Sequence, residues 1–145
     1  MRVYLDTSVY NRPYDDQTQV KIYLETQAVI ILLHLIETQQ IQSVNSSVLE
    51  YENSKNPFPI IQTAIQKYLT RASSFQPLNK AITKRANQLK TAGIKPIDAL
   101  HVASFEASAS NYFITCDQRL LNRCKALSIQ AINPTEFIEV LDNEN

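Results

Sequence analysis

The chain has 145 residues, of which 44% are hydrophobic and 19% charged, a balance that predicts one folded domain over residues 1–145 and excludes intrinsic disorder. Its 14 Lys and Arg residues balance 14 Asp and Glu residues, so bulk positive charge cannot drive binding to a polyanion. The single glycine, Gly93, excludes the glycine-rich loops with which P-loop and dinucleotide-binding enzymes hold phosphates.

Short β-rich segments alternate with longer segments of helical hydrophobic spacing. In chain order we expect a strand at 2–5, a loop at 10–17, a helix at 18–38, a strand at 41–45, a helix from 46 or 47 to about 56, a helix at 60–72, a strand at 75–78, a helix at 79–92, a helix at 96–108, a strand at 112–115, a helix at 117–127, a strand at 129–132 and a helix at 134–141. Strands separated by helices predict an α/β fold, a three-layer sandwich with a central parallel sheet.

The apolar segments predict a cytoplasmic protein that does not enter the membrane. The first apolar run stops at Asp6, which is too early for a signal peptide. The longest apolar stretch, residues 28–36, contains His34 and is about half the length of a membrane span. The two cysteines, Cys116 and Cys124, are therefore expected to be reduced thiols.

Four acidic residues fall at one expected edge of the sheet. Asp6 directly follows the first strand, and Glu50 lies in the first turns of the helix after the second. Asp117 lies two residues past the strand at 112–115, and Asp98 begins the helix that leads into that strand. Ligands of such sheets collect outside the carboxyl ends of the strands. Each acid taken alone also has a structural interpretation, as a helix cap or a first-turn acid.

Carboxylates that share a cleft raise one another's pKa or require a cation. A site made of oxygen ligands suits Mg²⁺ or Mn²⁺, and no Cys/His pair has the spacing of a zinc site. Ser8 beside Asp6 and Thr115 near Asp117 place hydroxyls that can orient carboxylates or water. For His101, one turn after Asp98, a hydrogen-bonded and partly buried side chain is the favoured interpretation.

Several polar and basic residues are candidates for binding a substrate. Arg12, Arg119 and Arg123 are candidate phosphate contacts, and Asn11 can reach the same cleft from the loop. Residues 53–97 contain eight Lys or Arg residues and no acid, which predicts either a basic rim or a solvated helical face. An acidic metal site bordered by cations favours phosphodiester hydrolysis, in which the metal activates a water.

These motifs resemble those of the PIN-domain ribonucleases, a family that includes the VapC-type toxins. The matching segments are Asp6-Thr7-Ser8, Ser47-Val48-Leu49-Glu50, residues 93–103 and residues 113–120. The resemblance implies an α/β/α sandwich of about five parallel strands in the order 3-2-1-4-5. It also implies cleavage of single-stranded RNA that depends on Mg²⁺ or Mn²⁺, by a protein that often dimerises and is blocked by an antitoxin.

The resemblance carries an acidic quartet and one hydroxyl onto this chain: Asp6, Glu50, Asp98, Asp117 and Thr115. Asp6 and Asp98 would be the core metal ligands, with Glu50 and Asp117 completing the site directly or through water. Ser8, Asn11, Arg12 and Arg119 remain as the candidate substrate contacts. Glu52 lies about 200° around the helix from Glu50, so only one of the two can face the cleft, and we expect Glu50 to do so because it lies at the helix start.

Two other classes of function are compatible with parts of this pattern. A PIN-like module that binds RNA or protein without cutting would be expected to lack one of the acids, and all four are present. A phosphotransfer enzyme of the haloacid-dehalogenase type would need an acid where Ser8 stands. A receiver domain would need an acid at the end of the third strand, where residues 77–79 offer none.

Overall fold

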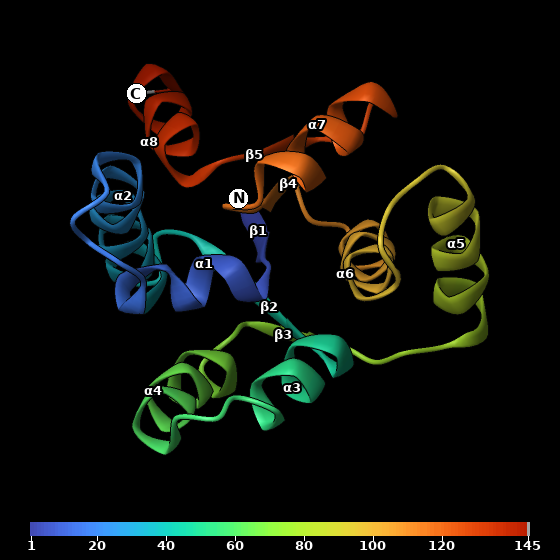
Figure 1. The fold of residues 1–145 in the computed structure, drawn as a ribbon, viewed down its shortest axis with the longest axis horizontal. Coiled ribbons are helices and arrows are strands. Elements are labelled where there is room, and N and C mark those ends of the chain that lie inside the picture. The colour runs from blue at the N-terminus through green and yellow to red at the C-terminus, as the bar shows by residue number, and fades with distance from the viewer. Residues whose placement is uncertain (145) are drawn as a thin grey trace.

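The computed structural model describes the backbone of residues 1–144 and the side chains of residues 1–143, and it contains the expected parallel sheet (Figure 1). Its strands are β1 (Arg2–Leu5), β2 (Gln42–Ser46), β3 (Ser74–Gln76), β4 (Tyr112–Ile114) and β5 (Ala131–Ile132). They are ordered β3-β2-β1-β4-β5, and every neighbouring pair is parallel. The predicted strand order is therefore confirmed.

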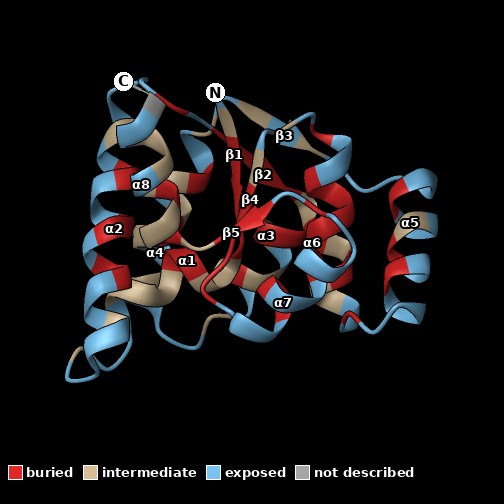
Figure 2. Cartoon of the chain, turned by 90° about the horizontal axis from the view of Figure 1, so that it is seen from above, coloured by how far each residue is buried: buried red, intermediate tan, exposed pale blue. Residues whose placement is uncertain are grey.

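Helices cover both faces of the sheet, which confirms the predicted sandwich. They are α1 (Thr7–Asn11), the 3-10 helix η1 (Arg12–Tyr14), α2 (Val20–Glu37), α3 (Ser47–Ser54), α4 (Pro59–Thr70), α5 (Lys80–Thr91), α6 (Pro96–Ala107), α7 (Gln118–Ala126) and α8 (Pro134–Glu144). Helices α2 and α8 pack together on one side of the sheet, and α6 lies on the other (Figure 1). Helix α5 packs outside α6 and forms the outer edge of the molecule on that side (Figure 2).

The centre of the sheet is the best-buried part of the fold (Figure 2). Three consecutive residues of β1, Val3, Tyr4 and Leu5, are fully buried, which is typical of a parallel strand covered on both faces. The ring of Tyr4 stacks on that of Phe113 in β4, with 5.8 Å between the ring centroids. This packing fixes the ends of β1 and β4 relative to each other, and the residues that follow those ends form the candidate site.

The loop expected over residues 10–17 begins with helical structure. Asp6 caps α1 by accepting a hydrogen bond from the backbone N–H of Val9 (3.3 Å), and the chain then continues directly into η1, which contains Pro13. A helix of five residues is too short to show the spacing by which a helix is found in a sequence. The loop prediction was therefore wrong for residues 10–14.

Among residues 1–144, no helix combines the length and the hydropathy that crossing a lipid bilayer requires. Asn145 lies outside the described residues. The assignment of residues 1–145 to one domain therefore stays a prediction.

Candidate functional site

Asp6, directly after β1, is the most buried acid of the candidate site, with 3% of its surface exposed. The hydroxyl of Ser8 donates to Asp6 Oδ1 and accepts from the backbone N–H of Cys116 (3.0 Å), so Ser8 ties the end of β1 to the end of β4. Burial raises the pKa of Asp6. The electrostatic effect of His101 and the hydroxyls of Ser8 and Thr115 oppose that shift.

Thr115 and Asp117 connect β4 to α7. Thr115 is fully buried, and its Oγ1 accepts a hydrogen bond from the backbone N–H of Asp117 (3.1 Å). Asp117 caps α7, with Oδ1 accepting from the backbone N–H groups of Arg119 (3.0 Å) and Leu120 (3.2 Å). The cap interpretation of Asp117 is confirmed. Its second oxygen makes no hydrogen bond to residues 1–144, so it is available to a ligand.

Asp98, in the first turn of α6, is a half-buried carboxylate that hydrogen bonds to none of residues 1–144. Burial, followed by the negative charges of Asp6 and Asp117, raises the pKa of Asp98 to about 6. The electrostatic effect of His101 opposes this shift, and the negative charge of Glu52 adds to it. The structure therefore brings Asp6, Asp98 and Asp117 together at the carboxyl edge of the sheet.

Helix α3 contributes Glu52 to this group of acids rather than Glu50. Glu52 Oε1 accepts a hydrogen bond from Thr7 Oγ1 (2.6 Å) and contacts Nε2 of His101. The expectation that Glu50 faces the cleft is therefore wrong. The physical reason is rotation along the helix: side chains two residues apart point about 200° away from each other.

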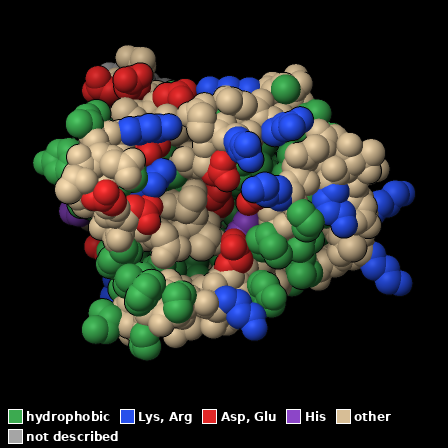
Figure 3. Space-filling view, in the orientation of Figure 1, with side chains coloured by type: hydrophobic (Ala, Val, Ile, Leu, Met, Phe, Trp, Pro, Cys, Tyr) green, Lys and Arg blue, Asp and Glu red, His purple; other side chains and the backbone are tan. Residues whose placement is uncertain are grey.

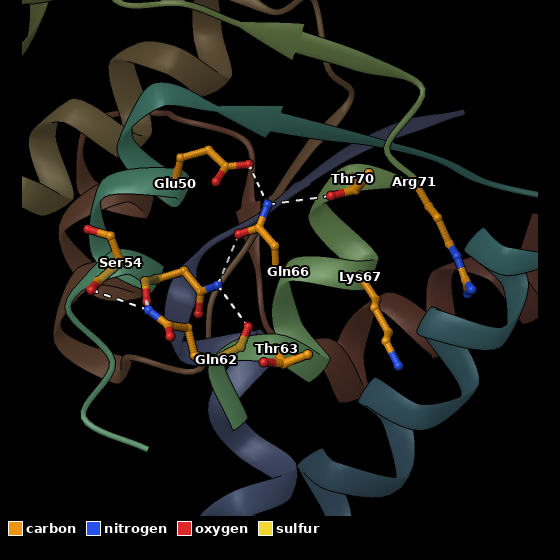
Figure 4. Close-up of a pocket in the computed structure, with 9 residues that line it drawn as sticks. Glu50, Ser54, Gln62, Thr63, Gln66, Lys67, Thr70 and Arg71 are labelled. Carbon is orange, nitrogen blue, oxygen red and sulfur yellow. Dashed lines mark hydrogen bonds between the residues drawn. The ribbon is translucent and has the colours of Figure 1, made fainter. Parts of the chain in front are cut away.

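Glu50 points toward α4 and borders a polar cavity of about 490 Å³ (Figure 4). Its Oε1 accepts from Asn45 Nδ2 (2.7 Å) and from Gln66 Nε2 (2.9 Å), as Figure 4 shows for Gln66. The cap of α3 is Ser46, so Ser47 and Glu50 do not form a capping box.

His101 is buried, with 1% of its surface exposed, and links the sheet to α3. Its Nδ1 hydrogen bonds to the hydroxyl of Tyr4 (2.8 Å), which also pairs with Ser46 Oγ (2.7 Å). Burial raises the pKa of Glu52, but the hydrogen bonds from His101 and Thr7 outweigh it and lower that pKa below its usual value. The hydrogen-bonded interpretation of His101 is confirmed. The sequence held one signal of its place, the spacing of one helical turn from Asp98.

The side chain of Arg12 contacts groups that hold the fold together and does not pair with the acids of the candidate site. Its Nη2 lies 3.2 Å from Glu25 Oε1 and donates to the carbonyl oxygen of Cys116 (3.3 Å), while Nη1 pairs with Asp15 (2.9 Å). Glu25 is buried, so this ion pair anchors η1 to α2. The structure does not present Arg12 to a substrate, and the prediction of a phosphate contact there is corrected.

Two of the remaining substrate candidates, Asn11 and Arg119, border separate cavities. Asn11 borders one of about 200 Å³ together with Glu52. Arg119 borders another of about 290 Å³ together with Asp98 and Asp117. Ser8 holds Asp6 and the backbone beyond β4, so its position indicates a role in orienting the site.

Two residues of the expected basic rim of residues 53–97 border cavities together with the acids: Lys95 with Asp98, and Lys55 with Glu52. Lys84 lies on the outer helix α5, and Arg85 pairs there with Glu106 (2.8 Å). Figure 3 shows Lys and Arg side chains directly beside the acidic side chains at the centre of one face of the molecule. Half of the eight basic residues, Lys80, Lys84, Arg85 and Lys90, therefore belong to α5 and not to the edge of the acidic cluster.

The chemistry of the donors fits a hard divalent cation. No salt bridge within residues 1–144 neutralises Asp6, Asp98 or Asp117. As placed, no group of three or more His, Cys, Asp and Glu side chains in this part of the chain is arranged to hold a metal ion. The fit thus rests on the donor atoms: Asp6 and Asp98 are crowded carboxylates with raised pKa values, and a bound cation would relieve their mutual repulsion as protonation does.

The fold and the site define an α/β/α protein with an acidic cluster at the carboxyl ends of its central strands. The model of the PIN domain family matches residues 3–126, and the chain belongs to that family, whose members are in general nucleases.

A solved structure with a similar fold is described as the crystal structure of VapBC2 from Rickettsia felis bound to a DNA fragment from their promoter. The similarity has a TM-score of 0.55, covers 92% of this chain and 98% of that chain, and comes with 16% sequence identity. The comparison with curated proteins found no match. The structural similarity therefore supports the fold.

Proposed function

We propose that the protein is an endoribonuclease that hydrolyses phosphodiester bonds of single-stranded RNA with Mg²⁺ or Mn²⁺. The observation that carries the proposal is the state of Asp98. Its carboxylate has no hydrogen bond within residues 1–144, and its pKa is raised to about 6 beside Asp6, Asp117 and Glu52. A divalent cation would neutralise these acids at the place where a phosphate backbone has to approach.

Each side chain has a separate task in this proposal. Asp6 and Asp98 would hold the cation, and Asp117 and Glu52 would complete its surroundings. When bound, the cation supplies a Lewis acid that activates water and stabilises negative charge on the phosphate.

Neighbouring groups hold the acids in place. Ser8 and Thr115 hold the carboxylate of Asp6. Thr7 and His101 both engage Oε1 of Glu52 and leave its Oε2 without a hydrogen bond in the described residues. That oxygen is available to accept a proton or to hold a water.

The proposal extends to the setting of the protein. We propose the toxin of a toxin–antitoxin pair, active in the cytoplasm, with an antitoxin protein as partner and a homodimer as its assembly. The similar fold in VapBC2 supports the toxin assignment. Cys116 and Cys124 are both free and buried, as expected in a reducing compartment. Induced expression of the unaltered protein is expected to arrest the growth of its host cells, whereas expression of the Asp98→Asn variant is expected to leave growth unchanged.

A catalytically silent module that binds RNA or protein is the second candidate. The observation in its favour is that, as placed, no group of three His, Cys, Asp or Glu side chains within residues 1–144 is arranged around one metal position. Such a module would bind RNA equally well with and without divalent ions and would release no products.

The two candidates are separated by incubating the purified protein with structured and unstructured RNAs in Mn²⁺ or in EDTA and mapping the ends produced. We expect cuts in unstructured RNA with Mn²⁺ and none in EDTA. The Asp98→Asn variant should bind RNA but leave it intact. Intact RNA with the unaltered protein in Mn²⁺ would contradict the proposal and favour the silent module.

A further inference from the structure

The arginines of this chain divide into two groups. Four of the six hold a partner on the protein: Arg2 with the carbonyl of Ser108, Arg12 with Glu25, Arg71 with Glu37 and Arg85 with Glu106. The side chains of the other two, Arg119 and Arg123, make no hydrogen bond or ion pair with residues 1–143, the range over which side chains are described. Both border the 290 Å³ cavity that also contains Asp98 and Asp117. The uncommitted arginines are therefore concentrated at the candidate site.

The guanidinium group of Arg123 lies close against Gly93. Gly93, between α5 and α6, has a φ of +103°, and a Cβ atom at this position would lie 2.8 Å from Arg123 Nη1 and 3.1 Å from its Cζ. The absence of a side chain at residue 93 lets the guanidinium group lie against the backbone. The guanidinium group has no negatively charged partner in this position, so its N–H donors remain available to a ligand.

The charges around this cavity are arranged in two groups. Lys95, Arg119 and Arg123 supply three positive side chains, and Asp98 and Asp117 supply two negative ones. No ion pair joins the two groups within residues 1–144. A ligand that carries phosphates can satisfy both, with its oxygens on the cations and its cleavable bond toward the acids. The planar fork of Arg suits phosphate in particular, because it donates two parallel hydrogen bonds.

We propose that Arg123, seated on Gly93, binds a phosphate of the RNA strand and thereby fixes the position of that strand over Asp98 and Asp117. Arg119 and Lys95 add positive charge to the same subsite. This inference rests on the proposed function, because it takes the RNA of that function as its ligand. Gly93 is assigned a specific task here, which is to leave room for the guanidinium.

The test is the binding of a labelled single-stranded RNA by the full chain in EDTA, measured over a range of salt concentrations. Replacing Arg123 by Gln is expected to weaken binding about tenfold, since a hydrogen bond from a charged group is lost. The slope of log affinity against log salt should fall in magnitude by about 0.7, the share of one phosphate contact on a single strand. The control Lys84→Gln removes an exposed cation on α5, outside the cavity, and should leave both quantities unchanged.

A second variant tests the seat. In Gly93→Ala the added Cβ displaces the guanidinium of Arg123, so binding should weaken in the same direction. In the Arg123→Gln background the same substitution should cost no further affinity, because its target is gone. The positive φ of Gly93 makes this variant strained, so thermal unfolding is recorded beside it. Arg123→Gln alters an exposed side chain and carries the test alone if the Gly93 variant fails to fold.

The outcomes separate this inference from the proposed function. Mn²⁺-dependent cleavage by the unaltered protein, with affinity and salt slope unchanged in Arg123→Gln, would overturn the inference and leave the function standing. Binding that depends on Arg123 without any cleavage would overturn the function and keep the phosphate site. No RNA binding by the unaltered protein would overturn both. If Arg123→Gln lost affinity for an acidic protein but kept its affinity for RNA, the cavity would be assigned to a protein partner and the inference would be overturned.

Discussion

Glu50 and Glu52 are the same residue type on the same helix, two residues apart, and they face different surroundings. Glu52 joins His101 and Thr7 beside the acidic cluster, while Glu50 joins Asn45 and Gln66 on the side of α4. They therefore form a matched pair in which charge and side-chain length are equal and only position differs.

Replacing Glu52 by Gln is expected to reduce Mn²⁺-dependent RNA cleavage by roughly a hundredfold, since it removes a carboxylate from the reacting groups. The Glu50→Gln variant should cleave like the unaltered protein, because its amide keeps an oxygen for Asn45 and Gln66. Initial rates with one RNA substrate measure both. Equal losses in the two variants would contradict the assignment of Glu52.

Asp98 gives the metal-free protein an unusual pH dependence. Its folded pKa of about 6 lies above the ordinary value of 3.8, so between these pH values the folded state keeps a proton that the unfolded state has lost. The contribution of this group to stability is therefore present below pH 3.8 and is lost as the pH rises through 6. At neutral pH its charge destabilises the fold.

In EDTA, Asp98→Asn is accordingly expected to raise the melting temperature at pH 7.5, and this gain should shrink as the pH falls toward 4. Calorimetry across the pH range measures both. A melting temperature that is the same for both proteins at pH 7.5 would show that the crowding of acids is not felt at Asp98.

Individual residues also show which parts of the candidate site could be predicted from the sequence. Asp6, Asp98 and Asp117 could be placed because strand ends and helix starts decide which edge of the sheet they occupy. The choice between Glu50 and Glu52 required the rotation of α3, which is set by its packing against α4 and α6. No local pattern records that packing.

At the scale of elements, periodicity decides what the sequence reveals. The long helix α2 and the strands that alternate with helices have strong patterns, and they were predicted close to their observed bounds. The short α1 and η1 have none. Their position depends on contacts distant in the chain, such as the pairing of Arg12 with Glu25, and the sequence proximity of Arg12 to Asp6 pointed instead to a substrate role.

The pair of Arg12 and Glu25 is expected to hold η1 on α2. The side chains are 17% and 3% exposed, so Arg12→Ala would leave the Glu25 carboxylate buried without its partner. The free energy of unfolding should fall by about 3 kcal/mol, measured by urea titration. As a control, Arg85→Ala breaks an ion pair whose side chains are 41% and 34% exposed, and should cost less than about 1 kcal/mol. Similar losses in both variants would contradict the anchoring role.

For the whole molecule, the acidic cluster joins distant parts of the chain. Asp6 follows β1, Glu52 lies on α3, Asp98 begins α6 and Asp117 caps α7. Because all four acids separate on unfolding, a cation bound among them stabilises the entire fold. Unfolding experiments can therefore detect the cation without RNA and without an activity assay. The parallel order of the strands, which the alternation of segments predicted, is what creates this shared edge.

Adding Mn²⁺ at a hundred times its dissociation constant is therefore expected to raise the free energy of unfolding by about 2.7 kcal/mol. Thermal unfolding of the unaltered protein should shift upward with Mn²⁺ and return with EDTA. Asp98→Asn should lose the shift, because it removes a carboxylate with no other partner in the described residues, whereas Glu50→Gln should keep it. The same shift in both variants would mean that Mn²⁺ binds elsewhere on the protein, and the acids at the sheet edge would then be a structural cluster.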